Sequence, residues 1–196
     1  IGIDHQESFE ELRDFVGTVA EGGCHVFIVH ARKAWLEGLS PKQNREIPPL
    51  NYEWVYALKE QFPHLTIVLN GGIQSLEECE QHLTKVDGVM LGRAAYQTPW
   101  LLSTVDSRLF GAEDPALTRE SVIVKLSAYV DDYLANGGRL NHVTRHILGL
   151  FHQQPGGRLF RRALSEGAHL IDADGKVLLA ALAEVTQRHG KESVVE

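Results

Sequence analysis

Three short clusters of polar and glycine residues, each at the end of an apolar run, are the residues of this chain best suited to do chemistry. The runs and their ends are HVFIVHAR (residues 25–32), LTIVLNGG (residues 65–72) and GVMLGR (residues 88–93). Glycine amides and a guanidinium bind phosphate, and an imidazole can donate a hydrogen bond to a planar ring or transfer a proton. The pattern predicts a ligand that carries a phosphate, with His30 either contacting a planar ring or acting as an acid or base.

The phosphate would be held by the second and third clusters. Asn70, Gly71 and Gly72 end one apolar run, and their glycines let backbone N–H groups approach an anion closely. We expect the dipole of the following helix to add to this attraction. Gly92 gives a second close approach, and Arg93 a guanidinium suited to bidentate contact. An ordinary turn and a surface arginine are the alternatives, but placement on successive strands favours one shared phosphate site.

His30 and the loop that follows it add a ring contact and a candidate RNA surface. His30 is expected to contact a planar cofactor or to act as an acid or base, with a core histidine as the alternative. The loop over residues 33–50 carries Trp35, Lys42 and Arg45. Aromatic and basic residues together suit single-stranded or flipped-out nucleotides. From the residues alone, a packed tryptophan with exposed cations is favoured, and Arg32 is likewise interpreted as a solvated loop cation.

Helical patterns separate the apolar runs. Ser8 and Glu11 have the spacing of a capping box and predict a helix over residues 8–20. Further helical stripes start near Tyr52 and Ser75. The run over residues 25–29 does not alternate, which predicts a strand buried on both faces. Alternating strands and helices indicate parallel strands, so the polar clusters meet at one edge.

After residue 114 only helical patterns follow, over residues 123–133, 143–150, 159–164 and 177–185. A closed (β/α)8 barrel needs eight strands and about 250 residues, whereas three complete strands are found here. We therefore expect an α/β fold that is the C-terminal part of a TIM barrel (residues 1–112), an all-α helical bundle (residues 113–190) and a tail (residues 191–196). The missing initiator methionine indicates part of a longer polypeptide, and an exposed parallel edge predicts poor behaviour when it is expressed alone.

Composition limits the classes of protein. The 196 residues are 43% hydrophobic and 23% charged, with a net charge of -7. Cys24 and Cys79 lack the spacing of a zinc site or a disulfide framework, and no run approaches the ~20 residues that span a bilayer. We expect a cytoplasmic protein without a metal or a membrane anchor.

Basic residues concentrate in one acidic-free stretch. No Asp or Glu occurs over residues 133–165, where Arg158, Arg161 and Arg162 share one helix face. This face either meets phosphates or is a solvated basic surface.

Five segments together resemble the tRNA-dihydrouridine synthases, A subfamily. They are HARKAWL (residues 30–36), GLSPKQNREIPPL (residues 38–50), NGG (residues 70–72), GRAAYQ (residues 92–97), and the region from TRHILGLF (residues 144–151) to FRR (residues 160–162). The resemblance covers nearly the whole chain. It implies a flavoprotein that uses FMN and NADPH to reduce the C5–C6 bond of D-loop uridines in tRNA.

The resemblance also assigns residues. The FMN phosphate would lie on Asn70, Gly71, Gly72, Gly92 and Arg93, with His30 at the isoalloxazine ring. The tRNA would be gripped by Lys42, Arg45, Arg158 and Arg161.

The resemblance also implies that no catalytic residue lies in this chain. The family's proton donor, a cysteine, and a lysine that contacts the flavin belong upstream, and neither Cys24 nor Cys79 matches the cysteine. Hydride would pass from reduced flavin to uracil C6 while that cysteine protonates C5. The fragment alone is therefore expected to be inactive, and a monomer is favoured. A flavin oxidoreductase acting on a small molecule and a non-catalytic RNA-binding module are the two alternatives.

Overall fold

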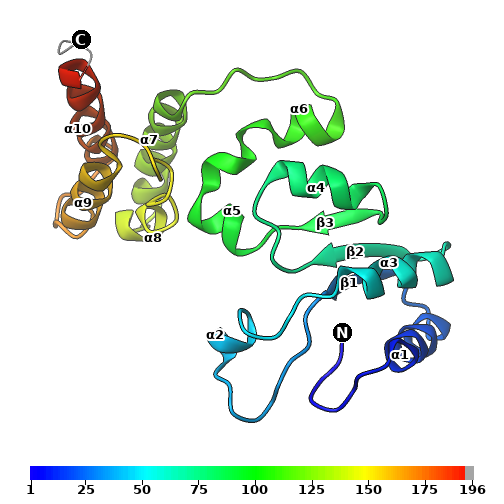
Figure 1. Cartoon of the computed structure of the whole chain (residues 1–196). Helices are drawn as coiled ribbons and strands as arrows, with labels where there is room; N and C mark the ends of the chain where they lie inside the picture. The colour runs from blue at the N-terminus through cyan, green and yellow to red at the C-terminus, as the bar shows by residue number, and fades with distance from the viewer. Residues whose placement is uncertain (193–196) are drawn as a thin grey trace. The chain divides into compact units, whose positions relative to one another are not determined.

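The computed structural model describes residues 1–192, and its side chains through residue 186. The chain folds into two compact units, Ile1–Gly92 and a second that starts at Arg93. The first unit contains a three-stranded parallel sheet in the order β1 (Val26–His30), β2 (Thr66–Asn70), β3 (Gly88–Met90) (Figure 1). The prediction of parallel strands alternating with helices is confirmed.

Capping side chains determine where the helices of the first unit begin. In α1 (Phe9–Glu21), Oγ of Ser8 accepts from the N–H of Glu11, whose carboxylate accepts from the N–H of Ser8. Side-chain oxygens of Asn51 and Ser75 cap α3 (Tyr52–Gln61) and α4 (Leu76–Leu83) in the same position. Such caps satisfy N–H groups that have no partner inside the helix.

The two faces of the sheet differ in burial. Ile67 and Leu69 of β2 are fully buried, on the face covered by α3 and α4. On the other face, Val26 and Ile28 of β1 are 58% and 60% exposed. The prediction that β1 is buried on both faces is therefore wrong in this structure, because its alternate side chains point away from the helices.

The second unit is helical within the described residues. Three short elements open it, α5 (Arg93–Gln97), the 3-10 helix η1 (Pro99–Thr104) and α6 (Val105–Phe110). They are followed by α7 (Arg119–Ala135), α8 (Leu140–Thr144), α9 (Gly157–Gly167) and α10 (Lys176–Glu192). Because α10 reaches Glu192, residues 191 and 192 belong to a helix rather than to the expected tail, and residues 193–196 lie outside the described part.

The division between the units falls earlier than the sequence boundary between residues 112 and 113. Trp100 of η1 packs against the buried cluster of the second unit, which explains why the short helices belong to it. Phe160 and Leu164 of α9 are fully buried and form the centre of this cluster with Ile123 of α7 and Leu178 of α10. Helix α10 packs along both α9 and α7.

The helix predicted over residues 143–150 is not continuous. Helix α8 ends at Thr144, and the chain continues in tight turns in which N–H groups bond the carbonyl three residues earlier. Gly149 lies against the backbone carbonyl of Gln97, which a Cβ atom would overlap. The short turns bring Gly149 into contact with Gln97, near the start of the second unit. A regular amphipathic helix would not make this contact. Within residues 1–192, no helix has both the length and the apolar character needed to cross a membrane.

Candidate functional site

The C-terminal ends of the strands place His30 and Asn70 side by side. His30 is the register partner of Asn70, and Asn70 is the partner of Met90 on β3. Residues in register on parallel strands project from the same face, so both side chains share the face that carries the exposed Ile28. His30 is itself exposed, and the core-histidine alternative is therefore wrong.

The chain turns sharply after Asn70. Gly71 and Gly72 have φ angles of +124° and +74°, a region that favours glycine. A Cβ on Gly71 would lie 2.9 Å from Cδ2 of His30, and a Cβ on Gly72 would lie 2.5 Å from Cδ1 of Leu50. Glycine is required at both positions, and the His30 ring lies against the turn. The structure thus brings together His30 and the three residues of the NGG motif.

The backbone of this turn offers hydrogen-bond donors. Among the described residues, no group of the chain accepts a hydrogen bond from the N–H of Gly72. Glu77 and Glu78 lie in the first turn of α4, where their carboxylates would oppose an approaching anion. The Glu78 carboxylate also accepts from the N–H of Gln74, 2.8 Å away. An anion at this edge would be bound by the glycine turn more than by the dipole of α4.

Gly92 is a glycine that the protein's own packing does not require. Its φ is not in the left-handed region, and a Cβ placed on it would meet no atom within 4 Å. It is exposed, two residues after the end of β3, and is bonded directly to Arg93, which begins α5. Open space beside a glycine with ordinary backbone angles fits a position that a ligand approaches closely.

The loop over residues 33–50 contains the short helix α2 (Pro41–Asn44), which the sequence pattern did not predict. The side chain of Asn44 accepts from the N–H of Trp35 at 2.8 Å and donates to the carbonyl of Trp35 at 2.7 Å. This pair of bonds closes the loop on itself. Lys42 lies within α2 and Arg45 directly follows it, and both side chains are exposed.

Arg32 anchors the same loop. One terminal nitrogen of its guanidinium donates to the carbonyl oxygens of Glu46 and Pro48. Its Nε is buried and has no acceptor among the described residues. The interpretation of Arg32 as a solvated loop cation is therefore wrong. It is a functional candidate that the sequence pattern missed, since nothing in the spacing shows that the loop folds back over it.

The basic face of α9 is exposed. Arg158, Arg161 and Arg162 are exposed, whereas Phe160 and Leu164 of the same helix are buried. One member differs from the others, because Nε of Arg162 forms an ion pair at 2.9 Å with the carboxylate of the residue four positions later, Glu166. The acidic-free stretch ends one residue before that partner.

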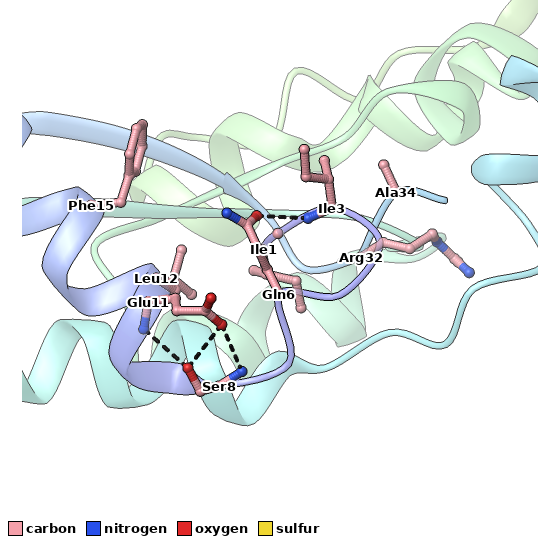
Figure 2. A pocket seen from close by; sticks show the side chains of 10 residues that line it. Ile1, Ile3, Gln6, Ser8, Glu11, Leu12, Phe15, Arg32 and Ala34 are labelled. Atoms are coloured by element: carbon pink, nitrogen blue, oxygen red, sulfur yellow. Dashed lines mark hydrogen bonds between the residues drawn. The ribbon is translucent and has the colours of Figure 1, made fainter. Parts of the chain in front are cut away.

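A cavity of about 410 Å³ lies beside the N-terminal segment of the first unit (Figure 2). Its charged lining side chains, Glu11 and Arg32, already form hydrogen bonds within the protein, Glu11 with Ser8 and a terminal nitrogen of Arg32 with the loop carbonyls. The Ser8 hydroxyl and N–H lower the pKa of Glu11 by hydrogen bonding to its carboxylate. The other lining side chains are mostly apolar, for example Leu12 and Phe15. The cavity therefore offers less chemistry than the strand ends.

Neither cysteine is placed for chemistry. Cys79 is fully buried on α4, and the thiol of Cys24 donates to the carbonyl of Val26 at 3.4 Å. In the part of the chain that the structure describes, no group of three or more His, Cys, Asp or Glu side chains could hold a metal ion.

Comparison with known proteins identifies relatives over almost the whole chain. Residues 1–187 match the family model "Dihydrouridine synthase (Dus)". The chain is 54% identical to a tRNA-dihydrouridine(20/20a) synthase of Vibrio vulnificus over 188 residues, covering 95% of this chain and 58% of that protein. A synthase of the same name from Escherichia coli K12 is 53% identical over 189 residues, covering 96% of this chain and 55% of the relative. The chain thus spans a little over half the length of these relatives, and the resemblance found in the sequence is confirmed.

Proposed function

The chain belongs to the dihydrouridine synthase family, and we propose that it supplies the FMN-phosphate site and a tRNA-binding surface to a tRNA-uridine reductase. The observation that carries this proposal is the glycine turn at residues 70–72 with His30 packed against it. The named relatives act on tRNA, and their names specify positions 20 and 20a. We extend that substrate and those positions to this chain.

The residues at the strand ends fit a flavin mononucleotide. A phosphate would accept hydrogen bonds from the glycine turn, and Arg93 would add a charge-assisted bond. Gly92 would let the ligand approach the backbone. His30, exposed beside the turn, would donate to a polar atom of the ring. A crowded two-glycine turn beside an exposed imidazole is the combination of donors that such a ligand needs.

When bound and reduced, FMN would supply the hydride that saturates the C5–C6 bond of uracil. The residues of this chain would hold and orient the ligand, and NADPH would be the reductant. We assign no proton donor within this chain, since Cys79 is buried and the Cys24 thiol bonds a backbone carbonyl.

Four exposed basic residues would bind tRNA. Lys42 and Arg45 lie on the ordered loop of the first unit, and Arg158 and Arg161 lie on α9 of the second. Arginine binds phosphate oxygens in a bidentate geometry, and a network of such contacts orients an RNA backbone. Order in the loop supports this assignment, because a preorganised surface loses less conformational entropy on binding.

The test is a reaction with the full-length gene product, FMN, NADPH and unmodified tRNA. Mass spectrometry of tRNA fragments should show the gain of two hydrogens at positions 20 and 20a. The matched control omits NADPH and should show no gain. Oxidation of NADPH on a small molecule with no change in tRNA would instead favour the small-molecule oxidoreductase. Tight tRNA binding without FMN binding would favour the RNA-binding module.

A further inference from the structure

Tyr52, the first residue of α3, lies against the glycine turn. Its hydroxyl donates to the carbonyl oxygen of Gly71 at 2.8 Å. The same hydroxyl oxygen would be 3.1 Å from a Cβ atom built on Gly72. The sequence pattern placed Tyr52 in the apolar stripe of a helix, so its contact with the turn is a finding of the structure.

This hydrogen bond fixes the direction of a neighbouring donor. The carbonyl of Gly71 and the N–H of Gly72 belong to one peptide group, and the described residues contain no cis peptide bond. In a trans peptide the C=O and N–H bonds point in opposite directions. Because the carbonyl is held toward Tyr52, the N–H of Gly72 points away from α3. Two successive glycines would otherwise permit many orientations.

Tyr52 is itself held in place by its neighbours. Its ring meets the ring of His82 on α4 edge to face, with centroids 4.6 Å apart. Nδ1 of His82 is 2.6 Å from the hydroxyl oxygen of Tyr56, one turn further along α3. Burial raises the pKa of Tyr52, which keeps its hydroxyl protonated and able to donate. The support therefore extends from the two packed helices to the backbone of the turn.

We propose that Tyr52 is a positioning residue that aims the N–H of Gly72 at the phosphate of the bound nucleotide. This inference rests on the proposed function, in which the glycine turn receives the phosphate of FMN. Tyr52 acts through the backbone and does not touch the ligand. Because Tyr52 acts on the peptide group that would bind the phosphate, its hydroxyl should matter for a ligand with a phosphate and not for the same ligand without one.

The test compares FMN with riboflavin, which has the same ring and no phosphate. Dissociation constants for both are measured with the full-length gene product and with Tyr52→Phe, by titration of flavin fluorescence. Loss of one hydrogen bond of ordinary net strength should weaken FMN binding by about fivefold. Riboflavin binding should not change. Tyr133→Phe is the matched control, because it removes a tyrosine hydroxyl that lies 3.3 Å from Nδ1 of His142 and takes no part in holding Tyr52, and its FMN affinity should equal that of the unaltered protein.

The outcomes separate this inference from the proposed function. An unaltered protein that binds FMN no better than riboflavin would contradict the phosphate site itself, and the role of Tyr52 with it. If the unaltered protein prefers FMN but Tyr52→Phe keeps the full preference, only the positioning role is overturned. If Tyr52→Phe binds FMN and riboflavin more weakly by the same factor, the positioning role is also overturned, since that result indicates a general structural role. A thermal melt of each variant accompanies the titrations.

Discussion

Substitution of Gly72 by alanine tests the packing of the proposed phosphate site. At φ +74° an alanine adopts the left-handed region, which costs about 1–2 kcal/mol. Its Cβ would also lie 2.5 Å from Cδ1 of Leu50, and overpacking of this kind costs about 1–3 kcal/mol more. The two contributions together predict a loss of about 2–5 kcal/mol in the free energy of unfolding.

Gly38→Ala is the matched control for this experiment. Gly38 has a φ of +83°, and a Cβ there would meet no atom within 4 Å. Gly38→Ala therefore has the backbone strain without the steric overlap, and its free energy of unfolding should fall by about 1–2 kcal/mol. The difference between the two variants measures the close approach of Leu50 to the turn. Denaturant unfolding followed by tryptophan fluorescence gives both values, and titration with FMN gives the affinity.

We expect Gly72→Ala to bind FMN more weakly, because the substituted turn no longer holds its binding geometry. Each 1.4 kcal/mol of lost binding free energy raises the dissociation constant about tenfold. Gly38→Ala should bind FMN normally. Equal destabilisation of the two variants, together with unchanged FMN affinity in Gly72→Ala, would refute both the packing argument and the assignment of the turn to the cofactor.

Three further predictions concern the rest of the chain. The double variant Arg158→Ala, Arg161→Ala should weaken tRNA binding and reduce the slope of log affinity against log salt by about 1 per lost phosphate contact. Arg162→Ala should change the slope less, because the Arg162 side chain already has a carboxylate partner. Equal slopes for all variants would contradict this prediction. Burial lowers the pKa of His82 from its ordinary value of 6.5, so the unfolded chain binds the proton more readily than the folded protein. The contribution of His82 to the free energy of unfolding should therefore be complete above pH 6.5 and fall as the pH drops below it. Urea titrations over this pH range should find a smaller loss in His82→Gln. Gly149→Ala should destabilise the second unit by about 1–3 kcal/mol or more, measured by its melting temperature, and an unchanged melt would exclude the close backbone contact.

Local signals predicted much of the first unit. The Ser8 and Glu11 spacing located the start of α1, because a capping box satisfies the same backbone groups wherever it occurs. The three apolar runs located the strands, and their parallel order placed His30 beside Asn70. That pairing is also the part of the candidate site that the sequence predicted best. The ligand that His30 and Asn70 contact stays a prediction.

Other features depend on contacts that are distant in sequence. The apolar run of β1 could not show that Val26 and Ile28 are exposed here, because the run is the same whether one or both sheet faces are covered. The closing of the loop by Asn44 depends on a backbone group nine residues away. Likewise, an aromatic residue at helical spacing is usually part of the core, so periodicity alone did not show that the hydroxyl of Tyr52 reaches the glycine turn.

The boundary between the units was also set by tertiary contact. Trp100 lies in a segment of short helices that could belong to either unit by pattern alone. Its packing against the buried cluster of the second unit decides the matter. The irregular turns near Gly149 have a similar cause, because a regular helix could not bring that residue against the backbone of Gln97.

The visible absorbance spectrum of the purified full-length gene product shows directly whether the protein binds a flavin. We expect the bands of a bound flavin, retained after gel filtration and released as FMN on denaturation. A colourless protein that also fails to take up added FMN would contradict the assignment of the strand-end residues to a flavin phosphate.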